Sequence, residues 1–350
     1  MTIPKAQTVA CVDNPRPDAT LEIRRDAPVP QPGAGEILIK MEYTGFCHSD
    51  VHNIKGDLPV STNIPGHEGV GRVIQVGPGT SSDYIGKRVG IKWLYSACNT
   101  CPICKTGRYT NCPNQRNCGR HVPGTFQQYV VSPAEWASPI PETLKPEAVA
   151  PLLCAGLTMY GALKKLDKFC QKGNWIVLMG AGGGLGHLGI QIGKEMGYNI
   201  IAIDSEPKRD ICMKSGAAAF IDFREDAEKR VKELTGDGFG AHAVVVVVGV
   251  ERAYDQGVTL IRPTGTVVCV GLPRIDYHIP ISPLFCVDRG YQIVGSAVGT
   301  EDELQALLKL AEAGKVSTHY EVFDFDKVND VMEKLVKYEI NGKAVLRLPE

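Results

Sequence analysis

The feature that most constrains the fold is a regular alternation of short apolar segments with helical segments, which begins near Asn174. Segments typical of buried strands stand at 175–179, 199–203, 219–223, 243–248, 266–270 and 291–295, and helical patterns lie among them at 185–196, 225–234 and 251–261. Strands and helices at this spacing form βαβ units, whose strands lie parallel in one sheet. The sequence therefore predicts an α/β domain with a doubly wound parallel sheet at 158–295.

A glycine-rich segment connects the first of these strands to the first helix. Glycines let the backbone approach a pyrophosphate, whose charge is favoured at a helix N-terminus. The spacing is G-x-x-G-x-x-G rather than G-x-G-x-x-G, but its place inside a βαβ unit indicates a dinucleotide site. An acid that ends the second strand would bind the ribose hydroxyls and repel a 2′-phosphate, so NAD is predicted over NADP. The predicted coenzyme-binding residues are Gly180, Gly183, Gly184, Leu185, Gly186 and Asp204.

The part of the chain before residue 158 has a different texture. It is rich in Gly and Pro, with short apolar segments such as 36–40 and 70–76, which is typical of an irregular β-rich domain. The length of 350 residues favours two domains. The tail, 296–350, with helices expected at 302–313 and 328–338, is predicted to complete the first domain, 1–157.

Charge and hydropathy limit the partners. The formal net charge is -1, which gives no electrostatic reason to expect nucleic acid or an anionic membrane. The longest apolar run, 243–248, is far shorter than the roughly 20 residues that span a bilayer, and the start of the sequence lacks a secretory pattern. We expect a cytoplasmic protein whose scattered cysteines are reduced.

Four of the twelve cysteines lie close together in the pattern C-x2-C-x2-C-x7-C. Zinc prefers four thiolates in a closed tetrahedron, and short gaps let one loop surround the ion. Iron–sulfur ligation is the alternative, since thiolates also suit clusters. Cys118 is expected to take no part. The predicted structural zinc ligands are Cys98, Cys101, Cys104 and Cys112.

A second metal site is expected from residues that lie far apart in the sequence. The segment 45–52 contains a thiol, imidazoles, a hydroxyl and a carboxylate, and the segment 66–71 contains a histidine and a glutamate. A third cysteine stands just before the βαβ region. Catalytic zinc sites use three protein ligands and keep one open position, and Cys2His is one known set. Cys47, His67 and Cys154 would supply it.

Together these stretches resemble a known family. The segments GFCHSDVH, IPGHEGVGRV, CPICKTGRYTNCPN, PLLCAGLTMYGALK and GAGGGLGHLGIQ are similar to zinc-containing members of the medium-chain dehydrogenase/reductase superfamily, and closest to fungal, yeast-type alcohol dehydrogenases. The resemblance implies a GroES-like catalytic domain, a Rossmann domain, an active site between them, two zinc ions per chain and NAD. It also implies an enzyme that interconverts a small-molecule alcohol and its carbonyl compound.

The resemblance also assigns roles to single residues. Asp50 would orient His67, and Glu68 would stand beside the metal. Ser49 would contact the substrate oxygen and pass a proton through the coenzyme ribose to His52. The implied coenzyme contacts are His48, Lys208 and Lys343, the last replacing the arginine usual in the family.

The expected substrate pocket departs from the family. Leu58 stands where yeast-type enzymes tend to carry a bulky aromatic residue, while Trp93 and Leu272 fit the family pattern. The sequence thus predicts a substrate larger than ethanol, such as a carbonyl compound of fungal secondary metabolism. A yeast-like homotetramer is favoured over a dimer, because the longer insertion of the dimeric animal relatives is absent.

Three alternatives remain at this point. One is a polyol or secondary-alcohol dehydrogenase of the same superfamily, which differs in substrate and not in chemistry. Another is a zinc-free quinone oxidoreductase, which would lack both ligand sets. The third is a non-catalytic protein that binds zinc and a nucleotide.

Overall fold

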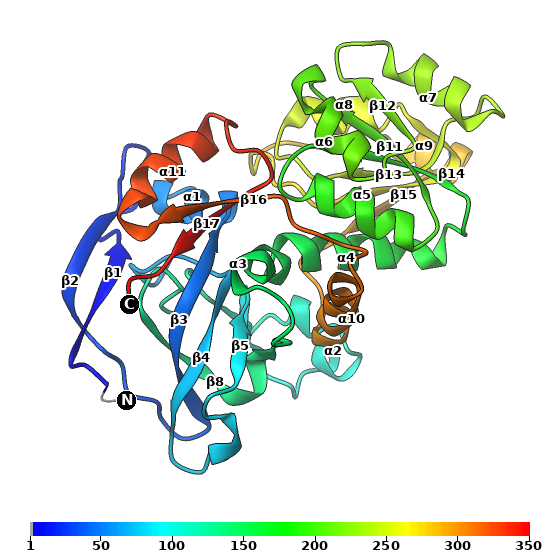
Figure 1. The fold of residues 1–350 in the computed structure, drawn as a ribbon. Helices are drawn as coiled ribbons and strands as arrows, with labels where there is room; N and C mark the ends of the chain where they lie inside the picture. Colours follow the sequence, from blue (N-terminus) through cyan, green and yellow to red (C-terminus); the bar gives the residue numbers. More distant parts are fainter. Residues whose placement is uncertain (1–2) are drawn as a thin grey trace. The chain divides into compact units, whose positions relative to one another are not determined.

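The computed structural model describes residues 3–350 and divides into two compact units (Figure 1). Among these residues, the first unit comprises 3–154, 300–308 and 318–350, and the second comprises 155–299 and 309–317. Each unit therefore receives segments that are distant in the sequence. The predicted domain boundaries at 157 and 296 remain a prediction.

The first unit is built on a mixed β-sheet. Its strands are β3 (Glu36–Phe46), β4 (Gly69–Val76), β5 (Arg88–Ile91), β8 (Tyr129–Pro133), β9 (Ser138–Pro139), β16 (Tyr320–Asp324) and β17 (Lys343–Arg347). Their order is β16-β17-β3-β4-β5-β9, and β8 pairs with the beginning of β3. β16 and β17 run parallel, and the remaining neighbours are antiparallel. The C-terminal strand β17 thereby lies next to the end of β3, where the candidate site begins.

Smaller elements surround this sheet. Two further antiparallel pairs are β1 (Ala6–Cys11) with β2 (Glu22–Pro28) and β6 (Leu94–Ser96) with β7 (Arg116–Asn117). The helices are α1 (His48–Lys55), α2 (Pro102–Lys105), α3 (Pro146–Val149) and α11 (Val328–Val336). The helix α10 (Glu301–Glu312) is divided, with residues 301–308 in the first unit and 309–312 in the second.

Periodicity explains the core of the first unit. Alternate residues of a strand share one face, and Ile37, Ile39 and Met41 of β3 enter the same buried cluster. α11 contributes residues at the i, i+3, i+4, i+7 spacing of an apolar helix stripe, namely Val328, Val331, Met332 and Leu335. α11 also contacts α1, which carries several candidate site residues.

The second unit has the predicted parallel sheet. Its strands are β10 (Trp175–Met179), β11 (Asn199–Asp204), β12 (Ala219–Asp222), β13 (Ala241–Val246), β14 (Ile261–Cys269) and β15 (Gln292–Gly295). They follow the order β12-β11-β10-β13-β14-β15, and every pair is parallel. This is the doubly wound arrangement in which the chain reverses direction across the sheet beside β10, and dinucleotides bind at that point.

Helices cover both faces of this sheet. They are α4 (Ala155–Lys164), α5 (Gly186–Glu195), α6 (Arg209–Lys214), α7 (Ala227–Thr235), α8 (Glu251–Gly257) and α9 (Pro283–Arg289). Val177 and Met179 of β10 pack in one cluster with Val231 of α7 and Tyr254 of α8. On the other face, Leu178 lies close to Gly189 of α5. Because both faces are buried, the strands are apolar throughout rather than alternating.

Two predicted helices extend at least two residues beyond the C-terminal ends of the observed ones. The segment 251–261 was expected to be one helix, but α8 ends at Gly257 and β14 begins at Ile261. Pro263 favours an extended residue before it, so the apolar pattern there belongs to a strand. The tail helix expected to reach 338 ends at Val336. α4, α6 and α9 were not predicted.

Within residues 3–350, no helix combines the length and the apolar character needed to cross a membrane.

Candidate active site

The turn between β3 and α1 positions the first candidate ligand. Cys47 precedes α1 directly and is buried. Its backbone N–H donates to Asp50 Oδ2 at 3.0 Å, so the helix start is closed by a carboxylate three residues on. This local turn fixes the direction of the Cys47 thiol.

Asp50 also reaches the second candidate ligand. It is fully buried, and its Oδ1 accepts from the backbone N–H of Gly66 at 3.1 Å and lies 2.8 Å from His67 Nδ1. A carboxylate on Nδ1 fixes the ring and leaves Nε2 available. His67 Nε2 lies 3.2 Å from Cys154 Sγ. Asp50 therefore orients both Cys47 and His67.

Cys47, His67, Glu68 and Cys154 form a buried cluster whose ligand atoms all lie within 4.8 Å of one another. The hydrogen bond between the two thiols lowers the pKa of Cys47 and raises the pKa of Cys154. Cys47 is therefore the thiol that loses its proton more readily. Zinc needs deprotonated thiols and ligand atoms spaced by less than about 4 Å. Two thiols and one oriented imidazole nitrogen fit such an ion.

A buried ion pair adjoins this cluster. Lys343 Nζ lies 2.7 Å from Glu68 Oε1, and both side chains are almost completely buried. Burial raises the pKa of Glu68 to about 7, although Lys343 opposes this shift. Glu68 Oε2 has no hydrogen-bond partner among the described residues, and it packs against Gly45 so closely that any side chain at position 45 would collide with it.

Sequence reasoning missed the contact between Lys343 and Glu68. The two residues are 275 positions apart, and β17 brings them together by pairing with the end of β3. The sequence assigned Lys343 to the coenzyme phosphates, and that assignment remains a prediction. The structure places its ammonium group on Glu68, because a buried carboxylate requires a counter-charge.

Two candidate proton-transfer residues lie on α1. Ser49 Oγ is 3.8 Å from Cys47 Sγ. His52 is half-buried, and its Nδ1 lies 2.7 Å from Asp57 Oδ2. Sequence reasoning missed Asp57, although the Gly56 before it marks the end of α1. The backbone N–H of Asp57 donates to the carbonyl of His52 at 3.0 Å, so the chain folds back and brings the carboxylate to the imidazole.

His48, the first residue of α1, stacks against Tyr338. The ring centroids are 5.2 Å apart and the ring planes differ by 21°. Burial lowers the pKa of His48. Tyr338 follows α11 and was not predicted as a site residue.

The predicted pocket residues occupy different environments. Trp93 meets the His67 ring edge-on, with the centroids 5.1 Å apart, so it lies directly beside the candidate ligand cluster. Leu58 is partly buried, just after the turn that contains Asp57. Leu272 belongs to the second unit and is exposed in that unit's loop after β14.

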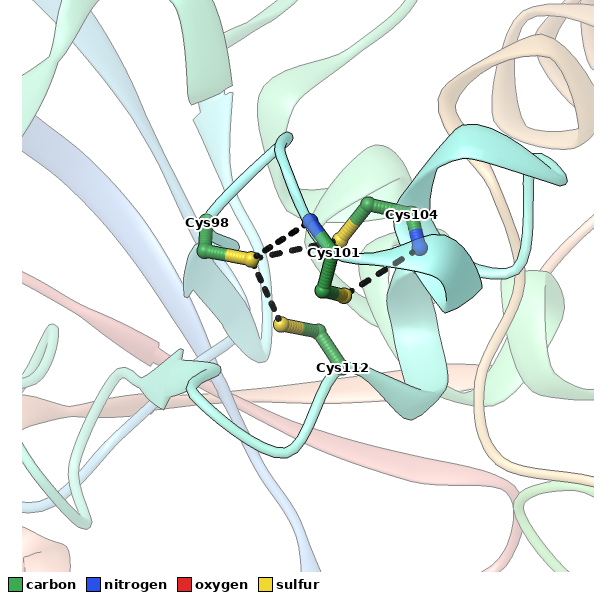
Figure 2. A group of neighbouring side chains, drawn as sticks. All are labelled: Cys98, Cys101, Cys104 and Cys112. Atoms are coloured by element: carbon green, nitrogen blue, oxygen red, sulfur yellow. Dashed lines mark hydrogen bonds between the residues drawn. The ribbon is translucent and has the colours of Figure 1, made fainter.

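The other four predicted ligands converge in one loop, as Figure 2 shows. Cys98 Sγ lies 3.6 Å from Cys112 Sγ and 3.9 Å from Cys104 Sγ. A zinc ion about 2.3 Å from each sulfur would space tetrahedral thiolates about 3.8 Å apart. Backbone donors lower the pKa of Cys98 to about 5, whereas burial raises the pKa of Cys104 to about 12. The observed spacing fits a closed, structural zinc site.

Cys118 is not a member of this group. It is buried, and burial raises the pKa of its thiol to about 12, so it behaves as a small apolar side chain.

The glycine segment of the second unit forms the predicted turn. Gly180 adopts a φ of 84°, and α5 begins at Gly186, where a side chain would collide with the Gly180 carbonyl. Asp204 ends β11, and its Oδ2 accepts from the backbone N–H of Gly182 at 2.8 Å. Gly183 and Gly184, with Leu185 as the residue before the helix, complete the turn.

The cations beside this turn have partners. Lys208 lies against Gly182, and Arg209 forms an ion pair with Glu206 at 2.6 Å. Arg224 forms an ion pair with Asp222 at 2.6 Å. Arginines neutralised by neighbouring carboxylates are poorly suited to a 2′-phosphate, which agrees with NAD as the coenzyme.

Comparison with known proteins agrees with this geometry. Residues 33–142 match the family of alcohol dehydrogenase GroES-like domains, and residues 184–313 match the zinc-binding dehydrogenases. The chain is 39% identical to alcohol dehydrogenase 2 of Emericella nidulans, with 99% of this chain and 98% of that protein covered. It is 41% identical to an alcohol dehydrogenase of Geobacillus stearothermophilus, over 90% of this chain and 92% of that protein.

A solved structure is similar over the same length. It is the acetophenone reductase of Geotrichum candidum in complex with NAD, with a TM-score of 0.86, 26% identity and coverage of 99% of this chain and 98% of that one. Two clusters of candidate zinc ligands, a dinucleotide turn and relatives matched over almost their whole length lead to one conclusion. The chain belongs to the zinc-containing, NAD-dependent alcohol dehydrogenases of the medium-chain dehydrogenase/reductase superfamily.

Proposed function

We propose that this alcohol dehydrogenase acts on alcohols and carbonyl compounds larger than ethanol. The observation that carries the proposal is Leu58, which follows the relay turn where yeast-type relatives tend to carry a bulky aromatic residue. A leucine leaves more room than an aromatic ring. The similar acetophenone reductase is named for an aromatic ketone, which supports a bulky substrate, such as a carbonyl compound of a biosynthetic route.

Cys47, His67 and Cys154 would hold the catalytic zinc. When bound, zinc polarises the oxygen of the alcohol or carbonyl compound, and NAD accepts or returns the hydride. Asp50 keeps the His67 ring in the orientation that presents Nε2. Trp93 packs against that ring and excludes water from one side of the cluster.

A proton must leave the buried site when an alcohol is oxidised. Ser49 stands two residues from Cys47, where its hydroxyl can accept the proton of the substrate and pass it outward. His52 is partly exposed and would receive that proton through the coenzyme ribose. Asp57 holds the His52 ring by its Nδ1, so we assign Asp57 as a positioning residue of this relay.

The coenzyme contacts are also proposals. Asp204 would accept from the adenosine ribose hydroxyls, and Lys208 would lie beside them. The Gly180–Gly186 turn and His48 would meet the pyrophosphate, with Lys343 as a further cation.

The first experiment follows NADH oxidation with a panel of short, branched and aromatic aldehydes and ketones, with and without a zinc chelator. We expect chelator-sensitive turnover with kcat/KM highest for the bulky compounds. In the variant Leu58→Trp, kcat/KM for bulky carbonyls should fall at least about 10-fold, because overfilling a packed pocket is costly. Acetaldehyde should be reduced about as well as before.

A matched control is Leu58→Met, which conserves the volume and should keep the preference. If ethanol and propanol were the best substrates of the parent enzyme, the proposed substrate class would be wrong. An absence of turnover with every carbonyl, despite bound zinc and NADH, would favour the non-catalytic alternative. A strong preference for polyols would favour the polyol dehydrogenase alternative.

We also propose that the chain forms a homotetramer. β15 lies at the edge of the second-unit sheet, and apolar side chains are exposed on it and on α9, including Ile293, Leu284, Phe285 and Val287. An apolar sheet edge is a surface on which a second copy can pair. The tetrameric state itself follows from the resemblance to yeast-type enzymes.

We also propose that the enzyme is located in the cytoplasm. None of the twelve cysteines forms a disulfide, which fits a reducing compartment. Recovery of the enzyme in a secreted or membrane fraction would contradict it.

A further inference from the structure

The end of α11 contains a residue in an unfavourable backbone conformation. Tyr338 has a φ of 57°, in the left-handed region. Its backbone N–H donates to the carbonyl of Leu335, and the N–H of Glu339 donates to that of Lys334. These two bonds define a helix-terminating motif whose left-handed position is usually occupied by glycine. For a residue with a bulky side chain this conformation is strained.

Burial does not explain why a tyrosine stands there. The residue is 62% exposed and belongs to none of the buried clusters of the first unit. A glycine would end the helix without this backbone strain. We therefore expect the tyrosine side chain to have a role other than stabilising the fold. Residues that break a local rule without a packing gain are found where function requires them.

The contact of the Tyr338 ring is with a candidate site residue. It stacks on the imidazole of His48 at a centroid separation of 5.2 Å, with the planes nearly parallel. His48 is the first residue of α1, and α1 packs against α11. The strained turn therefore places a flat ring on one face of His48 and restricts the orientations that the imidazole can adopt.

We propose that Tyr338 is a positioning residue for coenzyme binding, which holds the His48 ring in the orientation needed to donate to the NAD pyrophosphate. The inference rests on the proposed function, in which His48 meets that pyrophosphate. Tyr338 itself need not touch the coenzyme. The left-handed backbone of Tyr338 lowers the stability of the fold, while its ring orders the imidazole of His48.

The test measures two quantities that should move in opposite directions in the variant Tyr338→Gly. Removal of the strain should raise the melting temperature by roughly 2 °C. Loss of the stacked ring should weaken NADH binding, followed by the fluorescence of the bound coenzyme, by about 3- to 10-fold. A purely structural tyrosine would not combine a more stable fold with weaker coenzyme binding.

Two further variants separate the ring from the backbone. Tyr338→Phe keeps the ring and the strain, so both the melting temperature and the NADH dissociation constant should match the parent. Tyr338→Asn tolerates the left-handed conformation without a ring, so it should resemble the glycine variant.

A double-variant cycle with His48→Ala tests the coupling. Once His48 is removed, Tyr338→Gly should have no additional effect on NADH binding. An unchanged NADH dissociation constant in Tyr338→Gly would overturn the proposal, as would an equal loss of affinity with or without His48. Carbonyl turnover is measured separately, so failure of the proposed substrate class leaves these binding results fully interpretable.

Discussion

Lys343 and Glu68 make the most consequential single contact of the candidate site. Both charges are buried, and removal of one partner from a buried pair leaves the other without compensation, at a cost of about 3–5 kcal/mol. We therefore expect Lys343→Met to destabilise the enzyme strongly in chemical unfolding. The double variant Lys343→Met with Glu68→Gln should recover most of the loss, since no buried charge remains.

The loss of folding stability in Lys343→Met should also depend on pH. Burial raises the pKa of Glu68 from its ordinary value of 4.5 to about 7, and removal of Lys343 can only raise that pKa further. A carboxyl group with a raised pKa in the folded state contributes stability at low pH that is lost as the pH rises through that pKa. Below about pH 7 Glu68 is protonated in both folded proteins, so the deficit of Lys343→Met should be nearly constant there. It should grow above about pH 7, where the parent ionises Glu68 beside Lys343 and the variant cannot. A deficit independent of pH, or no recovery in the double variant, would contradict this account.

At the scale of elements, the eight residues of α1 position several candidate site residues. It begins beside a metal-ligand candidate, carries Asp50, and ends in a turn that returns Asp57 to His52. We expect Asp57→Ala to lower kcat for alcohol oxidation by roughly 10-fold. This is less than the roughly 100-fold or more that a general base contributes, because His52 remains and only its orientation is lost. Steady-state kinetics should show the change in kcat, while the NADH dissociation constant stays the same.

The control for Asp57 is the variant His52→Gln. If Asp57 acts through His52, Asp57→Ala should add no further loss in the His52→Gln background. An independent loss would mean that the carboxylate acts elsewhere, for instance by stabilising the end of α1.

At the scale of the whole molecule, the proposed tetramer would use the exposed apolar surface of β15 and α9 as an interface between copies. Light scattering should give a mass of about four chains of 37.9 kDa for the parent. Val287 is 85% exposed in the single chain, so Val287→Glu should reduce the mass by placing charges in the interface. Ile85→Glu alters an exposed apolar residue of the first unit and should leave the mass unchanged. If the parent had the mass of a single chain, the proposed tetramer would be wrong.

The sequence by itself determined the features that depend on local spacing. The four cysteines at 98–112 lie in one loop, so their spacing alone predicted the cluster that Figure 2 shows. The strand at 175–179, the glycine turn and Asp204 follow one another within a single βαβ unit, and the structure confirms the parallel sheet around them. Where Pro263 and the left-handed Tyr338 interrupt the pattern, the predicted helices extended too far.

Only the tertiary structure decided the contacts between distant residues. The pairing of β17 with β3 brings Lys343 to Glu68, and the packing of α11 on α1 brings Tyr338 to His48. Periodicity reports which face of an element is buried, but it does not report which residue of another element will lie opposite. The candidate metal ligands could be named from their chemistry and a family resemblance. The contacts of the side chains around them could be seen only in the assembled sheet.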